Sequence, residues 1–514
     1  MRKLFVVAAF CAASMFAADA SLLDAIKSGQ HATAVDIIAK KSADVNTPEA
    51  DGSTALLWAA NLNDTDLASR LLKAGADPKV RNKLGSTPLA EAAFNANSEL
   101  IKALLDAGAD ANATGPDGQT PLMLVARTAN VAAAKLLLDK GANPNAKEAQ
   151  RGQTALMWAS ASSQGPMVRE LLAHGAQPDA ATDIDMMTPL VSGEPRAQPR
   201  SPGGMTAMLF AVREGCIDCV KALIEKGAKV DLVDPEGVTP LISSLFNAHF
   251  DTAKYLIEQG ANIDRWDWWG RTPLYMAVDY ISLPHGGRPD QPSLDATLPI
   301  DIVKILLDRG ANPNMQLKMF PPYRATGNDR GLDGMLTVGS TPLLRAAKTQ
   351  DAAAIDLLLK HGALLELSTS QGMVPILAAA GIGSTDRDAR GNYRALDIQD
   401  RAIASLQLML DHGAQVNEKV GRQNQVPLQG AALWGWPKVA AFLIEKGAEV
   451  NSADSRGLTA LDYAQGRGGN TGTAVDVAPG RKEVADLLLS KGGKVGTPAP
   501  LQGPGGRGGA PPGR

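Results

Sequence analysis

The sequence predicts an all-α repeat solenoid, and three observations support this prediction. A glycine followed by a small residue recurs with a base period of 33 residues, as from Gly75 to Gly108 and from Gly108 to Gly141. Most periods also contain a Thr followed by a short run of mostly apolar residues. Only 4% of the 514 residues are aromatic, which suits a core made of Ala and Leu layers. Because one helix pair cannot bury its own apolar face, stacked pairs would share a continuous core.

The recurring glycine is expected to end the second helix of each unit, because the chain needs a left-handed residue there. Ser42 takes its place in one earlier unit, so the chain would contain about twelve units. Five of the intervals exceed the base period by more than ten residues, which predicts five insertions. The glycines of the series are Gly75, Gly108, Gly141, Gly175, Gly227, Gly260, Gly310, Gly362, Gly413, Gly447 and Gly492.

The first helix of each unit is predicted from stretches such as "GSTPLAEAA" and "GQTPLMLVA". The Thr side-chain oxygen can accept a hydrogen bond from an otherwise unsatisfied backbone N–H at a helix start. Proline is tolerated in the first helical turn. Small Ala residues follow, where helices must approach closely. After a short break comes a Leu-rich second helix, such as "VAAAKLLLDK".

Together these motifs resemble the ankyrin repeat, whose signature near the first helix is Thr-Pro-Leu-His-x-Ala. The resemblance extends over about residues 21–495, although His is rare in the signature here and the insertions are additional. It implies helix pairs joined by β-hairpin fingers. It also implies that the chain binds a protein partner through the concave face, the fingers and the insertions, without catalysis.

The two ends of the chain are predicted to differ from the repeats. Arg2 and Lys3, an apolar run and Ala18-Asp19-Ala20 indicate a secretory signal cleaved before Ser21, and thus a periplasmic or secreted protein without membrane insertion after cleavage. The predicted divisions are 1–20 (signal peptide), 21–50 (N-terminal capping repeat), 51–454 (repeat array), 455–495 (C-terminal capping repeat) and 496–514 (disordered Pro/Gly tail).

The repeat register places each insertion. Two are expected between units, in the fingers, near 183–202 and 316–337. Three are expected between the two helices of a unit, near 281–299, 381–399 and 466–478. Long loops in compact proteins are usually either functional or disordered, and both alternatives stay open here.

The stretch "RWDWWGRTPLY" carries three of the seven tryptophans of the chain, Trp266, Trp268 and Trp269, in one finger. One interpretation is that these rings pin the neighbouring insertion, since a buried Trp removes much apolar surface from water. The other is that they form a partner or ligand site, since Trp, Tyr and Arg are the usual interface anchors. The predicted partner-binding residues are Trp266, Trp268, Trp269, Arg271, Asp279, Tyr280, Tyr323, Arg324, Arg330 and Trp434.

The remaining tryptophans divide between core and surface. Trp58 and Trp158 occupy a first-helix position that normally packs inward, which favours a core role. Trp434 is expected on the exposed concave side, where it could make a second contact with a partner.

Composition and motifs argue against other classes of function. The 51 Lys and Arg residues face 54 Asp and Glu residues, so the basic surface of a nucleic-acid-binding protein is absent. A C-x-x-C pair, Cys216 and Cys219, can do redox chemistry at a helix start. This pair lies at ordinary positions of a second helix, however, which favours a local disulfide or two free thiols. We expect no cofactor, no metal and a monomer.

Three functional hypotheses remain. The preferred one is a protein-binding scaffold of the cell envelope. The alternative is a module that binds a glycan, small ligand or peptide at the Trp finger, residues 265–271. The least favoured is a hydrolase hidden in the insertions, which would use His285, Asp329 and Asp333.

Overall fold

The computed structural model contains helices and turns but no β-strand among the residues that it describes. The described residues are 21–41, 43–185, 202–281, 293–319, 337–383, 397–421, 423–467 and 480–497. The all-α prediction agrees with this content. The β-hairpin fingers are not confirmed, because the corresponding described segments are hydrogen-bonded turns, such as the one closed by Asp267 N and Arg271 O at 3.2 Å.

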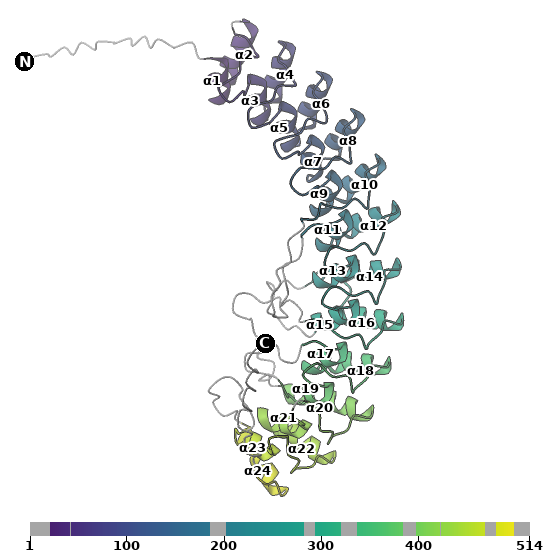
Figure 1. Cartoon of the computed structure of the whole chain (residues 1–514). Coiled ribbons are helices and arrows are strands. Elements are labelled where there is room, and N and C mark those ends of the chain that lie inside the picture. The colour runs from purple at the N-terminus through teal and green to yellow at the C-terminus, as the bar shows by residue number, and fades with distance from the viewer. Residues whose placement is uncertain are drawn as a thin grey trace, which may run out of the picture. The chain divides into compact units, whose positions relative to one another are not determined.

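The chain divides into two compact units, of which the first is residues 1–183. Within its described residues, the odd-numbered helices pack on one another in one row and the even-numbered helices in a second row (Figure 1). The helices are α1 (Leu22–Lys27), α2 (His31–Ala39), α3 (Ala55–Asn61), α4 (Thr65–Lys73), α5 (Pro88–Phe94), α6 (Ser98–Asp106), α7 (Pro121–Ala126), α8 (Val131–Asp139), α9 (Ala155–Ala161) and α10 (Gly165–Ala173).

The second unit is residues 184–514 and repeats the same pairing among its described helices. These are α11 (Ala207–Arg213), α12 (Ile217–Glu225), α13 (Pro240–Phe246), α14 (Phe250–Glu258), α15 (Pro273–Ile281), α16 (Pro299–Asp308), α17 (Pro342–Lys348), α18 (Ala352–Lys360), α19 (Pro375–Ala379), α20 (Ile398–Asp411), α21 (Pro427–Trp434), α22 (Pro437–Glu445), α23 (Ala460–Ala464) and α24 (Arg481–Ser490).

The helix boundaries follow from the two sequence motifs. Thr87 caps α5 by accepting the backbone N–H of Ala90 at 3.2 Å, and Pro88 begins the first turn. The second helix of the same pair, α6, is followed by Gly108 in the left-handed region, with φ 94°. Leu89 and Leu122 of consecutive first helices are both buried, in the layered apolar core that the pattern predicts.

The odd-numbered helices also form the surface that we call the first-helix face, the side of their row turned away from the second helices. In the first unit this face is open, since Phe94 at the end of α5 is 59% exposed. In the second unit the helices α17 and α21 are buried along their whole length. Helices α17 and α21 therefore leave less of their surface to solvent than α5 does.

Several predicted segments lie outside the described residues. These are the predicted signal peptide 1–20, residues 498–514 of the predicted tail, and the central parts of all five predicted insertions. Among the residues that are described, no helix is both long enough and apolar enough to cross a membrane.

Candidate functional site

The Trp finger is organised around a buried ion pair. The Asp267 carboxylate accepts the backbone N–H groups of Trp269 at 3.0 Å and Arg271 at 2.9 Å. It also accepts the Arg271 Nε–H at 2.6 Å, and the side chains of the pair are only 0% and 7% exposed. Arg271, which was predicted to contact a partner, therefore stabilises the turn of the finger through this ion pair.

Trp269 belongs to the interior of the finger. Its residue is 5% exposed, and the Arg271 guanidinium lies 4.7 Å from its ring centroid. The Trp269 carbonyl accepts the backbone N–H of Lys318 at 2.9 Å and of Met319 at 3.3 Å. These contacts hold the chain where the predicted 316–337 insertion begins, so the pinning interpretation suits Trp269.

Trp266 and Trp268 are displayed at the surface instead. They are 41% and 43% exposed, which is high for tryptophan side chains. The Lys318 Nζ lies 3.1 Å from the Trp266 ring centroid, in cation–π contact. The backbone N–H of Trp268 donates to Glu236 O at 2.8 Å, so the backbone is fixed while the ring remains accessible.

The other described residues of the predicted site contact neighbouring helices. Asp279 accepts Arg345 Nε–H at 2.6 Å, and the Tyr280 ring packs edge-on against Phe250 with centroids 4.9 Å apart. Both side chains therefore take part in packing between repeats. Tyr323, Arg324 and Arg330 lie outside the described residues, as do the hydrolase candidates His285, Asp329 and Asp333.

Trp434 is buried, so the expectation that it lies on an exposed surface is wrong. It is 8% exposed and stacks on Trp436, with ring centroids 6.3 Å apart. Its Nε1–H donates to Gly381 O at 2.7 Å. The turn after α19 thus covers the face of α21 that the repeat register alone leaves open.

Trp58 and Trp158 show the opposite difference, since both are half-buried rather than enclosed in the core. Trp58 is held at the edge of the first-helix face by Glu49, which accepts its Nε1–H at 2.8 Å, and by Lys27, whose Nζ lies 5.1 Å from its ring centroid. In α3 and α9 the fourth residue therefore lies partly in solvent, and the core interpretation of these two rings is corrected.

The first-helix face of the first unit carries a column that the sequence analysis missed. The Arg127 guanidinium, at the end of α7, lies 5.3 Å from the Phe94 ring centroid on α5 and 5.9 Å from the Trp158 ring centroid on α9. Arg127 is exposed and has no ion-pair partner among the described residues. We call Phe94, Arg127 and Trp158 the aromatic–arginine column.

A carboxylate on one of the helices of the column already has other partners. Glu91, on α5, accepts hydrogen bonds from Asn61 Nδ2 at 2.9 Å and from the Ser86 hydroxyl. A signal for the column was present in the sequence, since Phe94 and Arg127 are one 33-residue period apart. The arrangement presents five guanidinium N–H donors between two apolar rings.

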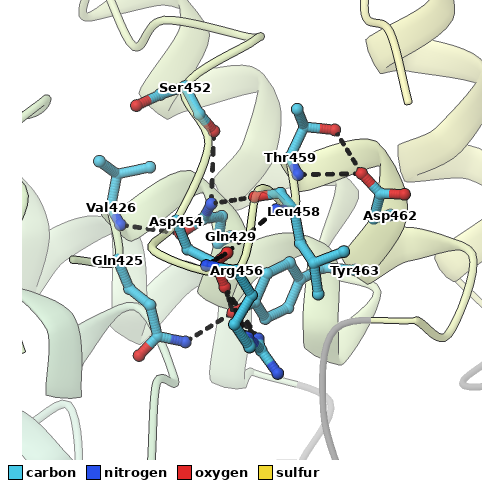
Figure 2. Close-up of polar contacts among 10 residues, drawn as sticks. All are labelled: Gln425, Val426, Gln429, Ser452, Asp454, Arg456, Leu458, Thr459, Asp462 and Tyr463. Carbon is cyan, nitrogen blue, oxygen red and sulfur yellow. Dashed lines mark hydrogen bonds and ion pairs between the residues drawn. The ribbon is translucent and has the colours of Figure 1, made fainter. Parts of the chain in front are cut away.

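A buried polar network joins α21 and α23 in the second unit (Figure 2). The Asp454 carboxylate accepts the Tyr463 hydroxyl at 2.9 Å and Arg456 Nη2–H at 2.8 Å, and Gln425 Nε2–H donates to the Tyr463 oxygen at 2.7 Å. Burial raises the pKa of Tyr463 to about 12.

This network has the character of a structural element. The Tyr463 hydroxyl has both donor and acceptor partners, and the Asp454 carboxylate is fully enclosed with an Arg beside it. Buried polar groups that are satisfied in this way specify packing. No group of three or more His, Cys, Asp or Glu residues suited to a metal ion occurs in the described part of the chain.

Comparison with known proteins agrees with the repeat architecture. A family model described as ankyrin repeats (3 copies) matches residues 22–115, 89–184, 180–267 and 208–317. These matches together span residues 22–317, more than half of the 514 residues. Repeats of this kind are generally protein–protein interaction modules and generally non-catalytic.

A human protein, transient receptor potential cation channel subfamily A member 1, is similar to part of this chain. The two are 26% identical over 270 residues, which covers 38% of this chain and 23% of the human protein. The chain thus matches less than a quarter of that relative. On the strength of the family match over most of the described helix pairs, the chain belongs to the ankyrin-repeat family.

Proposed function

We propose that the chain is a non-catalytic protein-binding scaffold of the cell envelope, with the aromatic–arginine column as its principal contact. The observation that carries this proposal is the exposed Arg127, which lacks an ion pair among the described residues and lies between the rings of Phe94 and Trp158. Two other cations beside rings of first helices, Lys27 and Arg213, instead have a carboxylate partner.

Two physical properties of the column favour binding to a partner, the interaction energy of its side chains and the restricted motion of its guanidinium. Aromatic and Arg side chains dominate the energetics of protein interfaces, especially where they cluster. A guanidinium held between rings loses less rotamer freedom on binding than a free one does. It also offers paired N–H donors to a carboxylate. The column therefore suits a partner segment that places an acidic group beside apolar residues.

The test is affinity capture from an envelope extract, with three forms of the protein compared side by side. These are the parent, the double variant Phe94→Ala with Arg127→Ala, and the control Lys135→Ala, which removes an exposed cation on α8. The proposal requires a protein captured by the parent and the control but lost with the double variant. Equal capture by all three forms would contradict it.

A second candidate function is recognition of a glycan or peptide at the Trp finger, and the exposure of Trp266 and Trp268 favours it. Exposed aromatic rings can stack on sugar rings or on Pro-rich peptides. Titration of a glycan and peptide panel would then quench Trp fluorescence saturably in the parent, and much less after Trp266→Ala with Trp268→Ala. A flat response across the panel would argue against this function. The predicted contacts of Tyr323, Arg324 and Arg330 with a partner stay predictions, since these residues lie outside the described part of the chain.

Export and oligomeric state are further parts of the proposal. The positive start and the small-x-small site of the sequence support cleavage before Ser21. Amino-terminal sequencing of the protein isolated from the cell envelope is expected to begin at Ser21, and an intact Met1 in that fraction would refute cleavage. Light scattering is expected to give the mass of a monomer, and a dimer mass would contradict that expectation.

A further inference from the structure

The cysteine pair occupies an unusual place on a second helix. Cys216 and Cys219 form a disulfide across the first turn of α12, and Cys216 is the N-cap residue of that helix. The backbone N–H of Cys219 donates to the Cys216 sulfur at 3.2 Å. In four other second helices, α4, α6, α8 and α18, an Asp or Asn oxygen accepts the corresponding hydrogen bond. The sulfur therefore stands where other repeats place an oxygen acceptor.

This position favours a thiolate when the disulfide is open. The first N–H groups of a helix and its dipole stabilise negative charge, and a thiol at a helix N-terminus has a lowered pKa. His249 lies close by, because a Cβ atom added at Gly215 would overlap its Nδ1. Its Nε2 hydrogen-bonds to Arg213 O at 3.1 Å.

The remaining charged groups around the pair largely offset one another or face elsewhere. Arg213, at the end of α11, pairs with Glu214 at 3.1 Å. Asp218, within the first turn of α12, opposes a thiolate but is exposed to solvent. On α14, Asp251 accepts backbone N–H groups of a later segment, from Ala296 at 3.1 Å. The N-terminus of α12 is therefore the main local influence that favours negative charge at Cys216.

The two sulfur-bearing residues differ in exposure. Cys219 is 0% exposed, whereas Cys216 is 8% exposed between the half-exposed residues Gly215 and Ile217. Cys216 is therefore the only one of the two that keeps any contact with solvent, and the proposal assigns it as the sulfur that an incoming thiolate attacks. Burial in apolar surroundings favours the neutral thiol at Cys219 after the bond opens.

A purely structural role explains this disulfide poorly. The bridge joins positions only three residues apart. In the chain-entropy account the stabilisation from a disulfide grows with the length of the closed loop, so this bridge is among the least effective possible. Reduction would leave α12 capped by the Cys216 sulfur, and the repeat would keep its fold.

We propose that Cys216 and Cys219 form a redox-active disulfide that exchanges with thiols. The thiolate of a dithiol substrate attacks Cys216 Sγ, and the bond to Cys219 breaks. Cys219 takes the electron pair and then a proton. The second substrate thiolate attacks the substrate sulfur of the mixed disulfide and releases Cys216 as a thiolate at the helix N-terminus. The substrate dithiol is oxidised to a disulfide by two electrons, and the protein disulfide is reduced to two thiols.

The first test measures exchange in the folded chain. Both tests use a chain that carries Cys11→Ser, in which Cys216 and Cys219 are the only cysteines. The protein is equilibrated with buffers of increasing ratio of reduced to oxidised glutathione, quenched in acid, alkylated and weighed by mass spectrometry. Reversible gain of two labelled thiols with an unchanged circular dichroism spectrum is expected. A disulfide that stays closed until urea unfolds the chain would overturn the proposal.

The second test separates the roles of the two sulfurs. Alkylation by iodoacetamide at pH 6.5 is compared between Cys219→Ser, which leaves Cys216, and Cys216→Ser, which leaves Cys219. Serine is itself a good N-cap, so the second variant should fold, and thermal melts would verify both. Cys216 is expected to react at least tenfold faster than Cys219 and than free glutathione. Equal or slower reaction of Cys216 would overturn the proposal.

Discussion

The three tryptophans of the finger should respond very differently to truncation. Trp269 is enclosed, with 5% exposure and the Arg271 guanidinium 4.7 Å from its ring. Replacement of a buried Trp by Ala usually costs about 3–5 kcal/mol, and loss of the cation–π contact belongs to the same change. Trp266 and Trp268 are 41% and 43% exposed, so their replacement removes less buried surface and should cost about 1–2 kcal/mol each.

The assay is urea unfolding of the parent and of the three single variants Trp266→Ala, Trp268→Ala and Trp269→Ala, followed by circular dichroism. Repeat proteins can unfold repeat by repeat, so a global titration is complemented by a local measurement. Backbone hydrogen exchange at residues 265–271 and at Lys318 supplies it. Only Trp269→Ala should speed exchange at Lys318, whose N–H donates to the Trp269 carbonyl at 2.9 Å. Equal destabilisation by all three variants would refute the division into one pinning and two displayed rings.

Three further predictions concern stability. Tyr463→Phe removes a hydroxyl that donates to Asp454 at 2.9 Å, and should lower the free energy of unfolding by about 1–3 kcal/mol in urea titrations; no change would contradict a structural network. The hydrogen bond to Asp64 raises the pKa of His31, so the stabilisation that the protonated His31 gives should be complete below pH 6.5 and disappear as the pH rises through the folded-state pKa. Hydrogen exchange in α2 should become faster over the same pH range, and His31→Gln should abolish this dependence. Gly270→Ala should destabilise the finger by about 1 kcal/mol or more, since φ is 84° and the new Cβ would lie 2.7 Å from a backbone nitrogen; an unchanged urea midpoint would exclude this strain.

The sequence predicted the repeat architecture well because its signals are local. A Thr cap, a following Pro and a terminal Gly each act within one turn of chain, as Thr87 and Gly108 illustrate. The exposure of Trp434 was predicted wrongly because it depends on a contact 53 residues away, with the Gly381 carbonyl. Such contacts depend on how particular turns pack, which the periodic pattern does not specify.

The aromatic–arginine column also depends on contacts that the periodic pattern does not specify. The spacing of Phe94 and Arg127 is visible in the sequence, but it does not reveal that Glu91 is engaged elsewhere. The availability of Arg127 is therefore a property of three adjacent repeats together. For the Trp finger, the sequence shows that the three rings are clustered, whereas the division into one buried and two exposed rings required the structure around Asp267.

Site-specific photocrosslinking tests the central claim most directly. A photoreactive phenylalanine analogue would replace Leu124, which lies on α7 one turn before Arg127, and in a matched control Lys135 on the surface of α8. If the column is the recognition surface, irradiation in an envelope extract gives one protein adduct from position 124, lost on adding Arg127→Ala, and none from position 135. An adduct at position 124 that survives Arg127→Ala, or an equal adduct at position 135, would contradict the account.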